Sequence, residues 1–94
     1  MKVERFKNVW DAIEKTSADA AVMTARSDLM IAVHDAVESW NVTLAQAAKR
    51  LKITQPRLND LLKGRITKFS LDALVNLATA AGLSVTVKVK KKAA

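Results

Sequence analysis

Two short helical patterns follow one another with only the dipeptide KI between them, and this spacing constrains the fold more than any other feature of the chain. In the first, VTLAQAAKRL, Thr43 and Gln46 have the spacing of a capping box. In the second, TQPRLNDLLKG, Thr54 is a fitting N-cap and Gly64 suits the position just after a helix. The segment is therefore predicted to form two short helices joined by a tight turn.

A proline near the start of the second pattern marks where that helix begins. Pro56 falls in the first helical turn, where its missing N–H would have had no helical partner. Each pattern also has one apolar side, so both helices are predicted to pack on a common core. The residues expected to face that core are Leu44, Ala47, Ala48, Leu51, Leu58, Leu61 and Leu62.

The side chains needed for most catalytic and metal sites are missing from the sequence. There are no cysteines and one histidine, which excludes disulfides, thiolate metal sites and His-based triads. With two glycines in all, the chain also has no glycine-rich phosphate loop. We therefore expect a protein that is not an enzyme and holds no cofactor or metal.

Positive charge is concentrated in the second half of the chain. Residues 1–40 carry five Lys/Arg and seven Asp/Glu, a net charge of −2, whereas residues 41–94 carry eleven Lys/Arg and two Asp/Glu, a net charge of +9. This asymmetry points to a polyanionic partner, although a solvated surface with a basic tail would give the same composition. No apolar run approaches the roughly 20 residues of a membrane span, and the N-terminus lacks a signal-peptide core, so a cytoplasmic protein is expected.

The chain resembles the Cro/repressor-type helix-turn-helix regulators, often called the xenobiotic-response-element family. The matching motifs are T-x-x-Q-A-A-x-x-L, then T-Q-P-R-L-x-x-L-L-x-G-R after the turn, and S-L-D-A-L; the resemblance covers about residues 24–82. The N-terminal NVWDAI and the trailing strand resemble the antitoxin-like subfamily. The family usually has Gly where this chain has Lys52, at a position that often adopts a positive φ.

The resemblance implies an all-α, lambda-repressor-like DNA-binding domain of four to five helices with a C-terminal β-strand that pairs in a dimer. The predicted organisation is an N-terminal segment at 1–16, a helix-turn-helix domain at 17–82, and a C-terminal strand and basic tail at 83–94.

The outer face of the second short helix is the predicted base-reading surface. In the family, the N-terminal part of this helix enters the major groove of DNA. Gln and Asn side chains can read adenine, Arg can read guanine, and Asp can accept from cytosine. The carboxylate in this set is equally suited to pairing with the cations three residues before and after it. The candidate base-reading residues are Gln55, Pro56, Arg57, Asn59 and Asp60.

A second set of residues around the motif is expected to contact DNA phosphates. Two threonines cap helices whose N-terminal amides favour anions, and long cations surround them. The resemblance implies a backbone-contacting cation at Arg65, just after Gly64. For any single lysine a solvated surface position is an equally good interpretation. The set comprises Thr43, Lys49, Lys52, Thr54, Lys63, Arg65 and Lys68.

The last residues alternate between apolar and polar side chains, the pattern of a strand with one apolar face. The apolar positions are Leu83, Val85, Val87 and Val89. Because a lone strand leaves its backbone groups unpaired, we expect it to pair with a second copy across a two-fold axis. Pairing with residues 2–6 and an unpaired tail are the alternatives.

The N-terminal segment also carries an apolar stripe at helical spacing, formed by Phe6, Val9, Trp10 and Ile13. This stripe would either pack on its own domain or bind a protein partner. The resemblance and the helix-turn-helix motif predict a sequence-specific DNA-binding transcriptional regulator that represses its own gene as a homodimer on an inverted-repeat operator. The resemblance and the N-terminal stripe together predict that this regulator is also the antitoxin of a toxin–antitoxin pair. The alternative is a phage-type repressor with no toxin partner.

Overall fold

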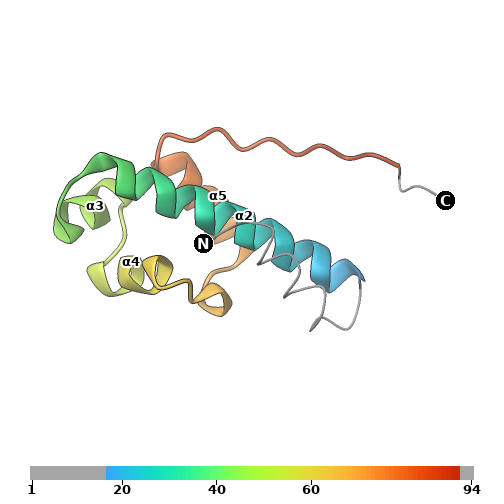
Figure 1. Ribbon diagram of the computed structural model, residues 1–94, viewed down its shortest axis with the longest axis horizontal. Coiled ribbons are helices and arrows are strands. Elements are labelled where there is room, and N and C mark those ends of the chain that lie inside the picture. The colour runs from blue at the N-terminus through green and yellow to red at the C-terminus, as the bar shows by residue number, and fades with distance from the viewer. Residues whose placement is uncertain (1–16, 92–94) are drawn as a thin grey trace.

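The computed structural model describes residues 17–91, and every regular element among them is helical. The expected all-α fold is confirmed over this range, with four α-helices and one short 3-10 helix in the order shown in Figure 1. The elements are α2 (Ser17–Trp40), α3 (Leu44–Leu51), α4 (Gln55–Leu62), η1 (Ile66–Lys68) and α5 (Leu71–Ala80). The predicted stripe at Phe6, Val9, Trp10 and Ile13 lies outside the described residues.

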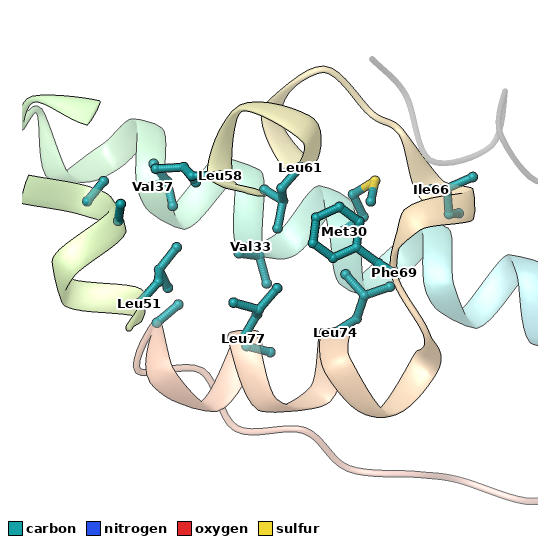
Figure 2. Packing of buried hydrophobic residues seen from close by; sticks show 14 of the residues in the cluster. Met30, Val33, Val37, Leu51, Leu58, Leu61, Ile66, Phe69, Leu74 and Leu77 are labelled. Atoms are coloured by element: carbon teal, nitrogen blue, oxygen red, sulfur yellow. The ribbon is translucent and has the colours of Figure 1, made fainter. Parts of the chain in front are cut away.

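The long helix α2 supports the other helices, which pack along it. It contacts α4, η1 and α5, and α3 contacts both α4 and α5. Figure 2 shows apolar side chains from all of these elements meeting in one core. Burying them is the main stabilising contribution to a domain of this size. The most fully buried large side chains are Phe69, Leu58, Leu61, Leu74 and Val33.

The two short helices bury most, but not all, of the side chains expected to face the core. Leu58 and Leu61 of α4 are buried, as is Leu51 of α3, whereas Leu62 is half-buried and packs at the margin of the core. The prediction is wrong for Leu44, whose residue surface is 41% exposed. Leu44 is the first residue of α3, and helical side chains lean toward the N-terminus, so it projects beyond the core.

The chain after α5 is extended and runs away from the helices (Figure 1). Leu83 and Val85 pack against the core, but Val87 and Val89 are 82% and 89% exposed. Residues 83–91 form no strand with any other part of the described chain. The alternative partner at residues 2–6 lies outside the described residues.

Candidate nucleic-acid interface

Helix α3 begins with the capping box expected from the sequence. The Thr43 hydroxyl accepts a hydrogen bond from the Gln46 backbone N–H at 3.2 Å, and the Gln46 side-chain oxygen accepts one from the Thr43 N–H at 3.0 Å. Two backbone donors that the helix cannot satisfy itself are paired in this way. The start of α3 is therefore fixed by residues within its own first turn.

The turn between α3 and α4 is closed by a lysine in the left-handed conformation. Lys52 has φ 61°, the positive value expected at the position where the resembled family has Gly. Its N–H donates to Lys49 O at 3.1 Å, and the N–H of Ile53 donates to Ala48 O at 3.0 Å. These bonds end α3 and change the direction of the backbone before α4 begins, and Lys52 is exposed.

Helix α4 presents its leading end to solvent. The Thr54 hydroxyl accepts a hydrogen bond from the Arg57 N–H at 3.3 Å, and Pro56 lies in the first turn, as predicted. Thr54, Gln55 and Pro56 are all exposed. The first turn of a helix also carries backbone donors without helical partners, which favour anions. This end is thus open to a ligand.

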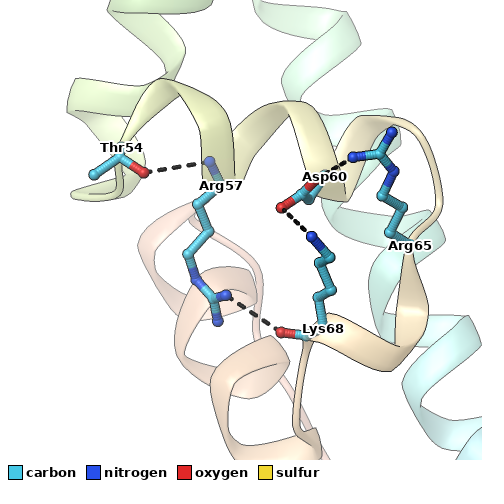
Figure 3. A network of polar contacts seen from close by, with 5 residues as sticks. All are labelled: Thr54, Arg57, Asp60, Arg65 and Lys68. Carbon is cyan, nitrogen blue, oxygen red and sulfur yellow. Dashed lines mark hydrogen bonds and ion pairs between the residues drawn. The ribbon is translucent and has the colours of Figure 1, made fainter.

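Arg57 does not project freely from this surface. Its guanidinium lies over the Phe69 ring, 4.4 Å from the ring centroid. Its Nη1 donates to Lys68 O at 3.3 Å, as Figure 3 shows. The side chain is half-buried. Reading a base with Arg57 would first require release of both contacts, a constraint that the sequence did not reveal.

Asp60 is held by two of the cations that were expected to contact phosphates. Its Oδ1 lies 2.7 Å from Arg65 Nη1 and its Oδ2 lies 3.6 Å from Lys68 Nζ (Figure 3). The hydrogen bond from Arg65 and the charge of Lys68 hold the pKa of Asp60 below its ordinary value of 3.8. Its side chain is only 18% exposed. The pairing expected with the cations three residues away, Arg57 and Lys63, is not the one formed.

Three of the predicted phosphate-contacting lysines remain available. Lys49, Lys52 and Lys63 are exposed, and within residues 17–91 none of them forms an ion pair. Asn59, a predicted base reader, is half-buried on the outer side of α4. The surface around the α3–α4 turn therefore combines the exposed cations Lys49 and Lys52 with two exposed residues of the predicted reading set, Gln55 and Pro56, while Lys63 lies at the other end of α4.

Arg26 of α2 bonds to the segment that follows α4 and so supports this surface from the side of the core. It was not identified from the sequence. Its Nε donates to Phe69 O at 2.8 Å and its Nη2 donates to Ile66 O at 3.2 Å. These bonds hold the segment that carries Phe69 and Lys68, the two residues that Arg57 contacts. A signal was present in the sequence, because Arg26 lies three residues after the buried Met23 and therefore on the same face of α2.

Two further kinds of feature are absent from residues 17–91. No helix there is long and apolar enough to cross a membrane. No group of His, Cys, Asp or Glu side chains in that part of the chain is arranged to hold a metal ion.

The arrangement of α3, the turn and α4 agrees with a comparison of the sequence with protein families. A family described as a helix-turn-helix domain matches residues 12–90. A search of curated protein sequences finds no match. The match spans most of the chain and includes every element from α2 to α5. The chain therefore belongs to this helix-turn-helix domain family, as expected of a DNA-binding regulator of transcription.

Proposed function

We propose that the protein is a sequence-specific repressor that binds an inverted-repeat operator as a homodimer and controls its own gene. The observation that carries this proposal is the exposed leading end of α4, next to the exposed lysines of α3 and of the turn, with a further exposed lysine after the other end of α4; none of the three forms an ion pair within residues 17–91. A helix N-terminus attracts phosphate, and an exposed outer face can reach base edges in the major groove.

Within this interface, different residues have different roles. Gln55 is the principal base reader, because its amide is exposed at the first helical position and can bond adenine at two points. Pro56 beside it offers an apolar contact, and Asn59 follows one turn later. The lysines Lys49, Lys52 and Lys63 contact phosphates and position the helix.

Arg57 and Asp60 have conditional roles in this proposal. Arg57 reads guanine only after leaving Phe69 and the Lys68 carbonyl, so its contribution depends on the DNA offering a better partner. Asp60 is already bonded to Arg65 and Lys68, and it serves chiefly to hold these two cations in place. Arg65 and Lys68 then reach phosphates as a fixed pair.

Two copies of α4 related by a two-fold axis would lie about 34 Å apart, so the operator half-sites should be centred about 10 bp apart. Binding should weaken steeply as salt increases, because each phosphate contact releases counterions.

The experiment is fluorescence anisotropy of labelled duplexes from the region upstream of the gene, titrated at several salt concentrations. We expect salt-sensitive binding to an inverted repeat that is much tighter than binding to a scrambled duplex. Gln55→Ala should weaken binding to the cognate duplex only, whereas Lys49→Ala should weaken binding to both. Equal affinity for cognate and scrambled duplexes would contradict the proposal.

A second proposed role is that of an antitoxin. The resemblance supports it, together with the apolar stripe of the N-terminal segment at Phe6, Val9, Trp10 and Ile13, which would bind and neutralise a toxin. The test is co-expression with the product of the neighbouring reading frame. Growth arrest relieved by the full chain, but not by a Trp10→Ala/Phe6→Ala variant that still binds DNA, would support it. A neighbouring product without effect on growth would favour a phage-type repressor.

A further inference from the structure

The extended segment after α5 has unpaired backbone groups. The N–H of Leu83 donates to Ala78 O at 2.9 Å, and beyond it residues 84–91 make no backbone hydrogen bond to any other described residue. An extended segment with a free row of N–H and C=O groups is a template for pairing with another strand.

The apolar face of this segment is covered only in part. Leu83 and Val85 rest against the core, whereas the next two members of the same stripe, Val87 and Val89, are almost fully exposed. Because alternate residues of an extended chain point to the same side, all four form one continuous apolar face. Half of this face lacks a cover within residues 17–91.

We propose that a second copy of the same segment covers it, antiparallel, with the two-fold axis passing beside Thr86. This proposal rests on the homodimer proposed above and specifies its register. Thr86 lies midway along the stripe, so Val85 faces Val87 of the partner subunit and Leu83 faces Val89 of the partner subunit. Each exposed valine then lies beside a residue that rests on the other subunit's core.

Side-chain direction and charge exclude the neighbouring registers. A shift that pairs odd-numbered with even-numbered residues places apolar side chains opposite polar ones. Moving the axis to Val87 places Leu83 opposite Lys91, and moving it to Lys88 places that lysine opposite its own copy, which is repulsive.

Moving the axis the other way, to Val85, leaves Val89 opposite Ala81, where the chain has already turned at Gly82. With the axis at Thr86, no lysine faces a lysine. Lys88 lies opposite Ser84, and Lys90 lies opposite Gly82. Thr86 faces its own copy on the polar side of the ribbon, away from both cores, and threonine pairs of this kind are favourable across strands.

The test is disulfide cross-linking, for which the chain is well suited because it has no cysteine of its own. Thr86→Cys should form a covalent dimer under mild oxidation, because directly opposed residues have Cα atoms about 4.5–5.5 Å apart, within disulfide range. Ser84→Cys and Lys88→Cys are matched controls on the same polar face. Alone, each would lie roughly 14 Å from its copy along the ribbon and should not cross-link. Mixed together, they should cross-link to each other.

The outcomes separate the register from the dimer. Cross-linking of Thr86→Cys, and of the mixed pair but neither control alone, supports the proposal. A dimer by light scattering that binds the operator but cross-links through another position overturns the register and leaves the proposed function standing. A monomer that binds a single half-site overturns both. A monomer whose residue 84–90 amides are protected from hydrogen exchange also overturns the proposal, because the strand would then pair within its own chain.

Discussion

Helices α3 and α4 are equal in length, at 8 residues each, and each is capped by a threonine, yet they are held in place differently. At the start of α3, Thr43 and Gln46 bond to each other's backbone within one turn. At the start of α4, Thr54 accepts a single bond, and the outer side chains of the helix bond instead to the segment after it.

The start of α3 is thus specified by its own residues, whereas the outer face of α4 is positioned by residues beyond the helix. Arg57 and Asp60 of α4 contact Arg65, Lys68 and Phe69, all of which follow the helix in sequence. The segment that carries these partners is in turn bonded to Arg26 of α2, through the carbonyls of Ile66 and Phe69. The geometry of the predicted reading face therefore depends on contacts across the domain, whereas the start of α3 does not.

The largest expected effect is the loss of stability when a core side chain is truncated, and it should be similar in α3 and α4 because both helices pack on the same core. Leu51→Ala in α3 and Leu58→Ala in α4 each remove a buried side chain, and we expect a loss of about 2–5 kcal/mol in the free energy of unfolding for either. Urea denaturation followed by circular dichroism measures it. Leu44→Ala is the control, since its side chain is exposed and its loss should be within roughly 0.5 kcal/mol. A large loss in only one of the two helices would break the view that they share one core.

The next largest effect is on operator binding, and it should distinguish a side chain of α4 that only contacts a base from one that also holds the helix in place. Gln55→Ala should weaken operator binding by about 1–3 kcal/mol and leave the free energy of unfolding unchanged, because the side chain is exposed. Arg57→Ala should also lower stability, by about 1 kcal/mol, through loss of the contact with the Phe69 ring. Anisotropy and urea denaturation on the same two variants measure both quantities. If Arg57→Ala weakened binding without any loss of stability, its stacked position would have no energetic significance.

The features that could be predicted from the sequence are those that depend on neighbouring residues. The caps at Thr43 and Thr54 and the proline start of α4 were predictable, because each depends on residues within one helical turn. The positive φ of Lys52 was suggested only by the glycine that the resembled family usually has at that position. The two short helices followed from apolar spacing for the same reason, whereas the number of helices in the domain was implied by the family resemblance.

The contacts that arrange the outer face of α4 could not be predicted in this way. Asp60 was a candidate base reader, with pairing to the cations three residues away as the alternative, but Arg65 and Lys68 reach it because the chain turns back at Gly64, which has φ 73°. Helical spacing does not describe residues beyond the end of the helix. Arg26 was missed because its partners are backbone carbonyls that lie 40 and 43 residues further along the chain.

A smaller effect is expected at the turn that joins the two helices. Lys52→Gly should raise the free energy of unfolding by about 0.5–1 kcal/mol, because glycine adopts the left-handed conformation without steric cost. The same variant should weaken DNA binding, since it removes an exposed cation. Lys63→Gly is the matched control: Lys63 has φ −85°, so glycine there should lower stability. If both glycine variants were destabilising, the left-handed lysine would carry no strain to relieve.

The smallest effect, and the one most specific to α4, concerns Asp60. Because Arg65 and Lys68 lower the pKa of Asp60 in the folded protein, its ionised form stabilises the fold at every pH above the ordinary value of 3.8. That contribution is lost as the pH falls through the lowered pKa. Asp60→Asn should therefore lower Tm at neutral pH, and the difference from the wild type should disappear in strong acid.

Calorimetric Tm values of the two proteins from neutral pH down to below 3.8 measure this difference. Lys63→Gln is the control, because it also changes the charge of the same helix end without removing a partner of Asp60. Its Tm difference from the wild type should not follow the titration of that carboxylate. An Asp60→Asn difference that stayed constant with pH would mean that the ion pairs contribute nothing to holding α4. Arg57 would then be the side chain that ties the outer face of α4 to the segment after it.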